Sequence, residues 1–180
     1  ASIDVERQLS KIDHLAEEIS DRTLPGIIQF LFQEQGFGGD KNSYYDPANS
    51  YIDQVLQRKR GIPITLAVIT IEVARRCGVP LFGVGMPGHF LVGHRDAEGV
   101  FVDPFDGNII DQSAARTLFL TLHPTQEFRP EFLSETAPRA IVLRLLNNLR
   151  MIHLRDRGVS ELVSVLELLV CFDDCPIDEF

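Results

Sequence analysis

The sequence predicts an α+β fold in which helices precede and follow a small antiparallel sheet. Between Ile3 and Ile19 apolar residues recur every three or four positions, which is the period of an amphipathic helix. An almost continuous apolar run follows Pro63, which indicates a helix buried at the centre of a domain. After Pro80 the apolar period shifts towards two, and that period is typical of strands.

Four helices are expected before the sheet. Proline is favourable in the first turn of a helix, as at the starts of the second and fourth. Asn49 or Ser50 can cap the third helix, and Gly78 ends the fourth. The glycines within residues 36–42 predict a loop between the second and third helices. The expected helix ranges are 3–19, 25–35, 49–60 and 63–77.

Three short strands follow, with expected ranges 81–86, 89–94 and 100–105. A turn at residues 105–108 closes this sheet, and residues 111–136 mix short helix and loop. Two amphipathic helices, 141–154 and 159–172, then form a helical hairpin. We therefore expect one domain at residues 1–136 and a helical hairpin at residues 137–180.

Composition excludes several classes of function. The 180 residues carry a formal net charge of −9, so neither nucleic acid nor an anionic membrane surface is an expected partner. The most apolar stretch, residues 62–74, is interrupted by Glu72 and is too short to cross a bilayer. No secretory signal is visible, and the three cysteines (Cys77, Cys171 and Cys175) form no disulfide framework. This usage indicates a reducing, cytoplasmic setting.

One histidine and one aspartate are the candidates for chemistry. In an antiparallel hairpin that places Gly93 opposite Gly99, His89 lies opposite Asp103 on the same face of the sheet. A carboxylate beside an imidazole fixes its tautomer and stabilises its protonated form, as in the second half of a catalytic triad. The pair is therefore either structural or catalytic, and catalysis through a triad also needs a nucleophile.

Several linked motifs resemble the SirB-one family of transglutaminase-like proteins. They are Tyr-Tyr-Asp-Pro-Ala-Asn-Ser at residues 44–50, Gly-Ile-Pro-Ile-Thr-Leu-Ala at 61–67, Met-Pro-Gly-His-Phe-Leu-Val at 86–92 and Val-Asp-Pro-Phe at 102–105. The resemblance implies a papain-like core, with a central helix packed against an antiparallel sheet. In active members a Gly-x-Cys motif supplies the nucleophile, and a His and an Asp follow on strands. His89 and Asp103 match the last two, whereas Pro63 stands at the nucleophile position.

Proline at that position changes the expected function. Pro63 has no nucleophilic atom and no backbone N–H for an oxyanion, so acyl transfer through the usual thiolate is excluded. Cys77 lies about 21 Å further along the same helix, and Thr65 points to another side of it. No residue replaces the nucleophile convincingly, and we expect neither a metal ion nor a cofactor.

Two functions remain open. The first is a non-catalytic module that binds a peptide or a protein in a pocket around the His–Asp pair; the helical hairpin would begin the tetratricopeptide-like region that the resemblance implies. The pocket residues expected on this reading are Tyr44, Tyr45, Asn49, Pro63 and Ile64. The second is a hydrolase of altered mechanism, in which His89, oriented by Asp103, acts as a general base on water.

Overall fold

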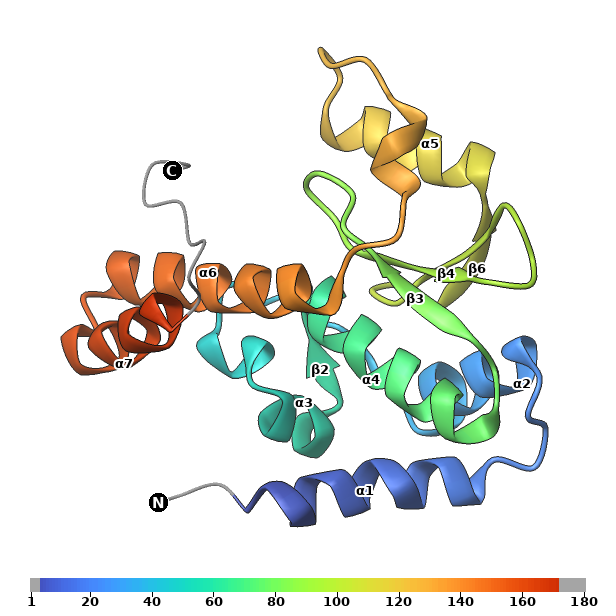
Figure 1. The fold of residues 1–180 in the computed structure, drawn as a ribbon, viewed down its shortest axis with the longest axis horizontal. Helices are drawn as coiled ribbons and strands as arrows, with labels where there is room; N and C mark the ends of the chain where they lie inside the picture. Colours follow the sequence, from blue (N-terminus) through green and yellow to red (C-terminus); the bar gives the residue numbers. More distant parts are fainter. Residues whose placement is uncertain (1–3, 172–180) are drawn as a thin grey trace.

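The computed structural model describes residues 4–171 and confirms the α+β class (Figure 1). The helices are α1 (Val5–Glu18), α2 (Leu24–Ile28), α3 (Ile52–Arg58), α4 (Pro63–Cys77), α5 (Gln112–Leu122), α6 (Pro138–Asp156) and α7 (Val159–Val170), with a π-helical turn η1 (Gln29–Glu34) and 3-10 turns η2 (Pro47–Ser50) and η3 (Pro130–Leu133). The strands are β1 (Gly38–Gly39), β2 (Arg60–Gly61), β3 (Leu81–Val84), β4 (Leu91–His94), β5 (Val100–Asp103) and β6 (Asn108–Asp111).

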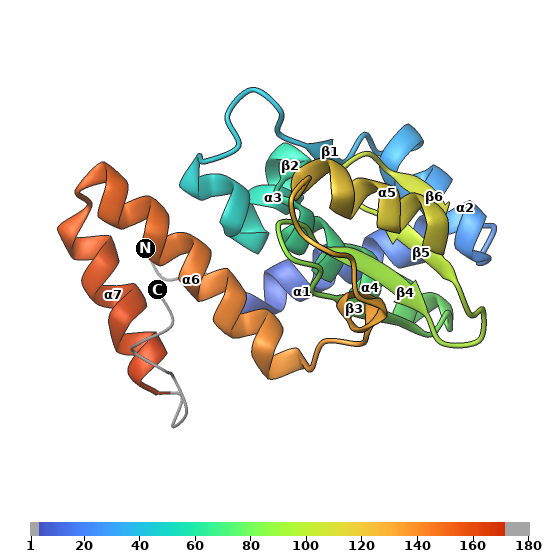
Figure 2. The same ribbon diagram turned by 90° about the horizontal axis from the view of Figure 1, so that it is seen from above.

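Helices cover both faces of an antiparallel sheet whose strand order is β3-β4-β5-β6. On one face α4 packs against β3 and β4, and α1 and α2 pack against α4 in turn. On the other face α5 lies over the sheet (Figure 2), and Ala115 and Phe119 of this helix are buried in one cluster with Leu91 and Phe101. β3, β4 and β5 are therefore mostly buried, which accounts for strands that read as short apolar runs, whereas β6 at the edge of the sheet is largely exposed.

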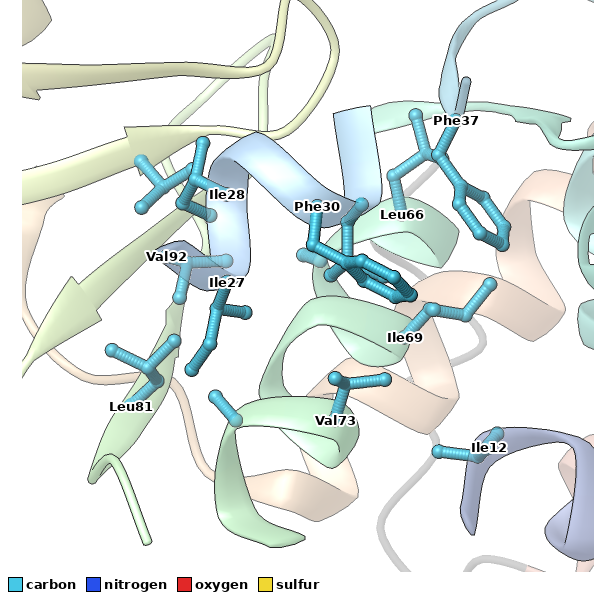
Figure 3. Packing of buried hydrophobic residues seen from close by; sticks show 14 of the residues in the cluster. Ile12, Ile27, Ile28, Phe30, Phe37, Leu66, Ile69, Val73, Leu81 and Val92 are labelled. Atoms are coloured by element: carbon cyan, nitrogen blue, oxygen red, sulfur yellow. The ribbon is translucent and has the colours of Figure 1, made fainter. Parts of the chain in front are cut away.

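The central helix α4 is buried on most of its faces. Its side chains Leu66, Ile69 and Val73 are almost fully buried, and Ile69 and Val73 lie between Ile12 of α1 and Phe30 of the η1 segment (Figure 3). Pro63 begins the helix, because its fixed φ suits the first turn. Gly78 ends it with φ +80°, a left-handed conformation that favours glycine. These are the bounds that the sequence predicts.

The first half of the chain departs from prediction at two places. Gly38 and Gly39, expected within a loop, form a short parallel bridge with Arg60 and Gly61. The third helix begins after Tyr51, while Asn49 and Ser50 belong to the preceding 3-10 turn and cap nothing. Both differences arise from contacts between segments that are distant in sequence. The local pattern of turn residues does not predict such contacts.

The sheet confirms the three expected strands and corrects their pairing. Gly93 lies opposite Phe101, not opposite Gly99, so the register of β4 and β5 is shifted by two residues. A shift of two keeps every side chain on its face. A fourth strand, β6, begins at Asn108, where the sequence predicted only a turn.

The helical hairpin of α6 and α7 is present as predicted up to residue 171, and the expected end at residue 172 lies outside the described residues. Four buried residues hold its two helices together: Leu146, Leu149, Val165 and Leu169. Ile141 and Leu145, nearer the start of α6, pack against the central core instead. The domain division at residue 136 stays a prediction. No helix within residues 4–171 is long and apolar enough to cross a membrane.

Candidate functional site

His89 and Asp103 form a directly bonded pair at one end of the sheet. His89 follows the Pro87-Gly88 turn before β4, and Asp103 is the last residue of β5. The distance from His89 Nε2 to Asp103 Oδ1 is 2.9 Å, and the two side chains are 10% and 9% exposed. The backbone N–H of Phe105 donates to the same Oδ1 at 2.9 Å. The corrected register makes the pair diagonal neighbours, and such neighbours are within reach on one face.

The hydrogen bond to Asp103 determines which nitrogen of the neutral His89 ring carries the proton. A carboxylate accepts, so Nε2 must donate and Nδ1 keeps its lone pair. Within the part of the chain that the structure describes, no protein group bonds to Nδ1. An imidazole in this tautomer presents the lone pair of Nδ1 as an acceptor.

Two helices fix the turn that carries His89. The Arg144 Nη2 of α6 donates to the carbonyl oxygens of Met86 at 3.0 Å and His89 at 2.7 Å. His123, just after α5, bonds through Nε2 to the carbonyl of Pro87 at 3.1 Å. These contacts give polar partners to the carbonyls of a turn that makes few ladder bonds. The imidazole is thus held by its backbone as well as by Asp103.

Sequence reasoning missed both supporting residues. Arg144 lies between Ile141 and Leu145, the two residues that pack α6 against the core. A charged residue on the buried face of an amphipathic helix was therefore a readable signal. His123 follows the last turn of α5 and stacks at 5.0 Å on Phe119, and nothing in its local sequence connects it with residue 87.

Pro63, His89 and Asp103 line the same cavity, whose volume is about 550 Å³. The first turn of α4 supplies Pro63, and the segment between β1 and η2 supplies Tyr44 and Tyr45. The remaining lining residues are Lys41, Gly88, His89, Asp103, Phe105, Asp106, Leu118 and Leu122. A second cavity of about 170 Å³ adjoins it and contains Ile64 together with Tyr44, Pro63 and His89. Of the expected pocket residues, four line these two cavities.

Asn49, the fifth expected pocket residue, lies elsewhere. Its side chain is fully buried, and its amide donates to the carbonyl of Ser43 at 2.8 Å and to Asp40 Oδ2 at 3.3 Å. Asn49 therefore supports the segment that carries the two tyrosines from beneath. Neither the residue type of Asn49 nor its position in the motif shows whether it lines the pocket or supports the segment that does.

Of the alternative nucleophiles considered from the sequence, those within residues 4–171 do not line the cavity with His89. The hydroxyl of Thr65 is buried and donates to the carbonyl of Asn49 at 2.8 Å. Cys77 is at the far end of α4, and Cys171 is exposed at the end of α7; Cys175 lies outside the described residues. Between residues 4 and 171 no group of three or more His, Cys, Asp or Glu residues is arranged to hold a metal ion.

A third cavity, of about 480 Å³, continues on the far side of Tyr44. Its walls are mainly apolar and include residues of α6: it is lined by Tyr44, Tyr45, Ile62, Asn148, Met151, Ile152 and Arg155. Arg155 lies 4.9 Å from the centroid of the Tyr45 ring. Because Tyr44 lines all three cavities, we treat them together as one groove, with His89 and Pro63 at its middle.

Comparison with known proteins connects this site with a family. The family model described as "Transglutaminase-like superfamily" matches residues 4–147. A "UPF0162 protein" of Xylella fastidiosa is 39% identical over 155 residues, which cover 80% of this chain and 55% of the relative. Another "UPF0162 protein", from Vibrio cholerae, is 31% identical over 153 residues, 81% of this chain and 55% of the relative.

A eukaryotic protein shares a shorter segment. "F-box only protein 21" of Mus musculus is 40% identical over 95 residues, which cover 52% of this chain and 15% of the relative. The chain spans about half the length of the bacterial relatives named above. No solved structure matches the chain.

Proposed function

Since this chain belongs to the transglutaminase-like superfamily, as its motifs predicted, we propose that it is a non-catalytic member that binds an extended peptide segment of a partner protein in its groove. One observation carries the proposal. Pro63 lines the same cavity as His89 and Asp103, at the helix end where the resemblance places the nucleophile.

The chemistry of Pro63 removes covalent acyl transfer. Its ring has no atom that can attack a carbonyl, so no thioester forms on this helix. It also lacks the N–H that would otherwise point from the first turn of α4 towards a developing oxyanion. The His–Asp pair is then a relic of a catalytic dyad, which still contributes hydrogen-bonding groups to a binding site.

The shape and lining of the groove support an extended peptide as the ligand. Cavities of about 550 and 480 Å³ flank the middle of the groove, so a bound chain has room on both sides. Tyr44, Tyr45 and Met151 supply apolar walls, and the His–Asp pair and Asn148 supply polar groups. Aromatic walls with a few polar groups are typical of sites that recognise side chains.

A displayed library of random decapeptides, selected on the immobilised protein, tests this proposal. The strongest peptide is synthesised and its Kd is measured by fluorescence anisotropy. Tyr45→Ala and Met151→Ala should each weaken binding about tenfold, because each removes an apolar wall. Leu154→Ala is the matched control, since Leu154 lies on the same helix and is 52% exposed against 57% for Met151. An empty selection, or equal Kd values in all four proteins, refutes peptide binding in the groove.

One observation favours a second candidate, hydrolysis without a covalent intermediate. His89 keeps an unbonded Nδ1, so it can take a proton from water while the hydroxide attacks a bound carbonyl. A panel of amide and ester substrates decides between the candidates. Turnover that disappears in His89→Ala supports the hydrolase, whereas a complete lack of turnover across the panel supports the non-catalytic reading.

Two further parts of the proposal concern the cellular compartment of the protein and the role of its C-terminal helices. The free thiols of Cys77 and Cys171 favour the reducing cytoplasm. We infer that the α6–α7 hairpin begins a tetratricopeptide-like region, because its two helices pack as an antiparallel pair. Limited proteolysis tests the second point: a hairpin in such a region is protected to the end of α7.

A further inference from the structure

The guanidinium of Arg144 is a half-buried positive charge in the middle of the groove. Its Nη2 donates to two carbonyl oxygens, and its charged group lies 5.4 Å from the centroid of the Phe90 ring. Among residues 4–171 no carboxylate lies within ion-pair distance of it. Arg144 differs in this from Arg58, which forms an ion pair with Asp46, and from Arg76, which forms one with Asp13.

Burial without a counter-ion is costly for a cation. It lowers the pKa of the Arg144 guanidinium from its usual value, because the charged form loses its water. Hydrogen bonds to the two carbonyl oxygens replace only part of the interaction that the guanidinium loses with water. An anion placed beside the remaining N–H groups would recover the lost interaction and form charge-assisted hydrogen bonds.

The small second cavity, which Arg144 lines together with Pro63 and His89, has the size and the chemistry for one carboxylate. Its volume is about 170 Å³, and no acidic side chain is among its lining residues. Asn148 adds an amide that can donate. The first turn of α4 is the positive end of that helix; Pro63 has no N–H, but Ile64, which also lines the cavity, has a backbone N–H without a partner inside the helix. Residues of two helices that carry hydrogen-bond donors therefore line one small cavity.

We propose that Arg144 and Asn148 bind the side-chain carboxylate of an aspartate or glutamate in the peptide. This proposal rests on the proposed function, since it assigns the middle residue of the bound chain. The small cavity shares lining residues with each of the two larger cavities, so a chain that occupies both larger cavities passes the small one and presents a side-chain carboxylate to it. A carboxylate at the end of a chain would instead leave one flanking cavity empty.

Small probes test the site directly by NMR. N-acetyl-glutamate N-methylamide carries the side-chain carboxylate, its glutamine counterpart carries a neutral amide, and N-acetylglycine carries a chain-end carboxylate. Each is titrated into the ¹⁵N-labelled protein. The glutamate probe should shift the backbone amides of Gly88, His89 and Asn148 saturably, with a Kd about tenfold lower than that of either other probe.

Two variants test whether the charge of Arg144 is responsible for the preference for glutamate. Arg144→Gln should weaken the glutamate probe about tenfold and abolish its advantage over the glutamine probe. Arg139→Gln, an exposed change on the same helix, should leave both properties unchanged. Comparing the three probes on the unaltered protein needs no variant, so a misfolded Arg144→Gln does not remove the test.

The outcomes separate this proposal from the proposed function. Equal Kd values for the glutamate and glutamine probes overturn the carboxylate site, even if peptides are selected in the groove. An equal or stronger response to N-acetylglycine overturns the assignment to a side chain. If the glutamate probe alone binds but no peptide is selected, the carboxylate site stands and peptide binding is refuted.

Discussion

Replacing Pro63 by cysteine returns a thiol to the first turn of α4, beside His89. A free thiol has a pKa of about 8.5, and the positive end of a helix together with an imidazolium lowers it to about 7 or below. This difference corresponds to about 2 kcal/mol. The loss of a favourable proline should lower the free energy of unfolding by only about 0.4–1 kcal/mol, so the variant should fold.

The assay is the pH profile of alkylation by iodoacetamide, measured in a chain whose native cysteines are serine. The midpoint of the Pro63→Cys profile should lie near or below about pH 7. Gln112→Cys is a reference thiol at another helix start: Gln112 begins α5, is exposed where Pro63 is buried, and follows the capping carboxylate of Asp111 in place of His89. Its midpoint should lie near about pH 8, and His89→Ala should move the Pro63→Cys midpoint to the same value. Equal midpoints for Pro63→Cys with and without His89 would refute the geometry of the site.

Three further predictions concern stability. Leu66 is 1% exposed, so Leu66→Ala should lower the free energy of unfolding in urea by about 2–5 kcal/mol, and a loss below 1 kcal/mol would contradict its central place. A Cβ at Gly93 would lie 2.3 Å from Phe82 Cζ, so Gly93→Ala should cost about 1–3 kcal/mol, whereas an unchanged Tm would show that the ring does not cover this strand. The backbone N–H of Ser43 lowers the pKa of Asp40; the carboxylate therefore stabilises the fold above its unfolded pKa of about 4, and that contribution is lost as pH falls through the lower folded pKa. The Tm difference between the unaltered protein and Asp40→Asn should accordingly vanish in acid, and a constant difference would contradict the role of the charge.

Local sequence patterns predicted the elements that depend on local physics. The bounds of α4 follow from a proline at its start and a glycine at its end, and both act within one turn. Strand β6 was missed because Asn108 begins it directly after a glycine turn, and its partner β5 stabilises it. Tertiary pairing outweighed turn propensity there.

The site was predictable in its chemistry and only partly in its geometry. The sequence placed His89 and Asp103 on one face of the sheet correctly despite a two-residue error in register. Side chains alternate between the faces with a period of two, so an error of two residues does not change the face. Arg144 belongs to a helix more than fifty residues away in sequence from His89, so no spacing rule connects the two. Asn49 shows the opposite error, since a residue of the right motif supports the segment from beneath.

The tautomer of the His89 ring is the decisive property of the site, because both proposed functions depend on how Asp103 holds this imidazole. Long-range ¹H–¹⁵N correlation at neutral pH distinguishes its two nitrogens. The account predicts a protonated Nε2 that donates to Asp103 and an unprotonated Nδ1, with this preference lost in Asp103→Ala. A proton on Nδ1, or a tautomer ratio that Asp103→Ala leaves unchanged, would contradict it.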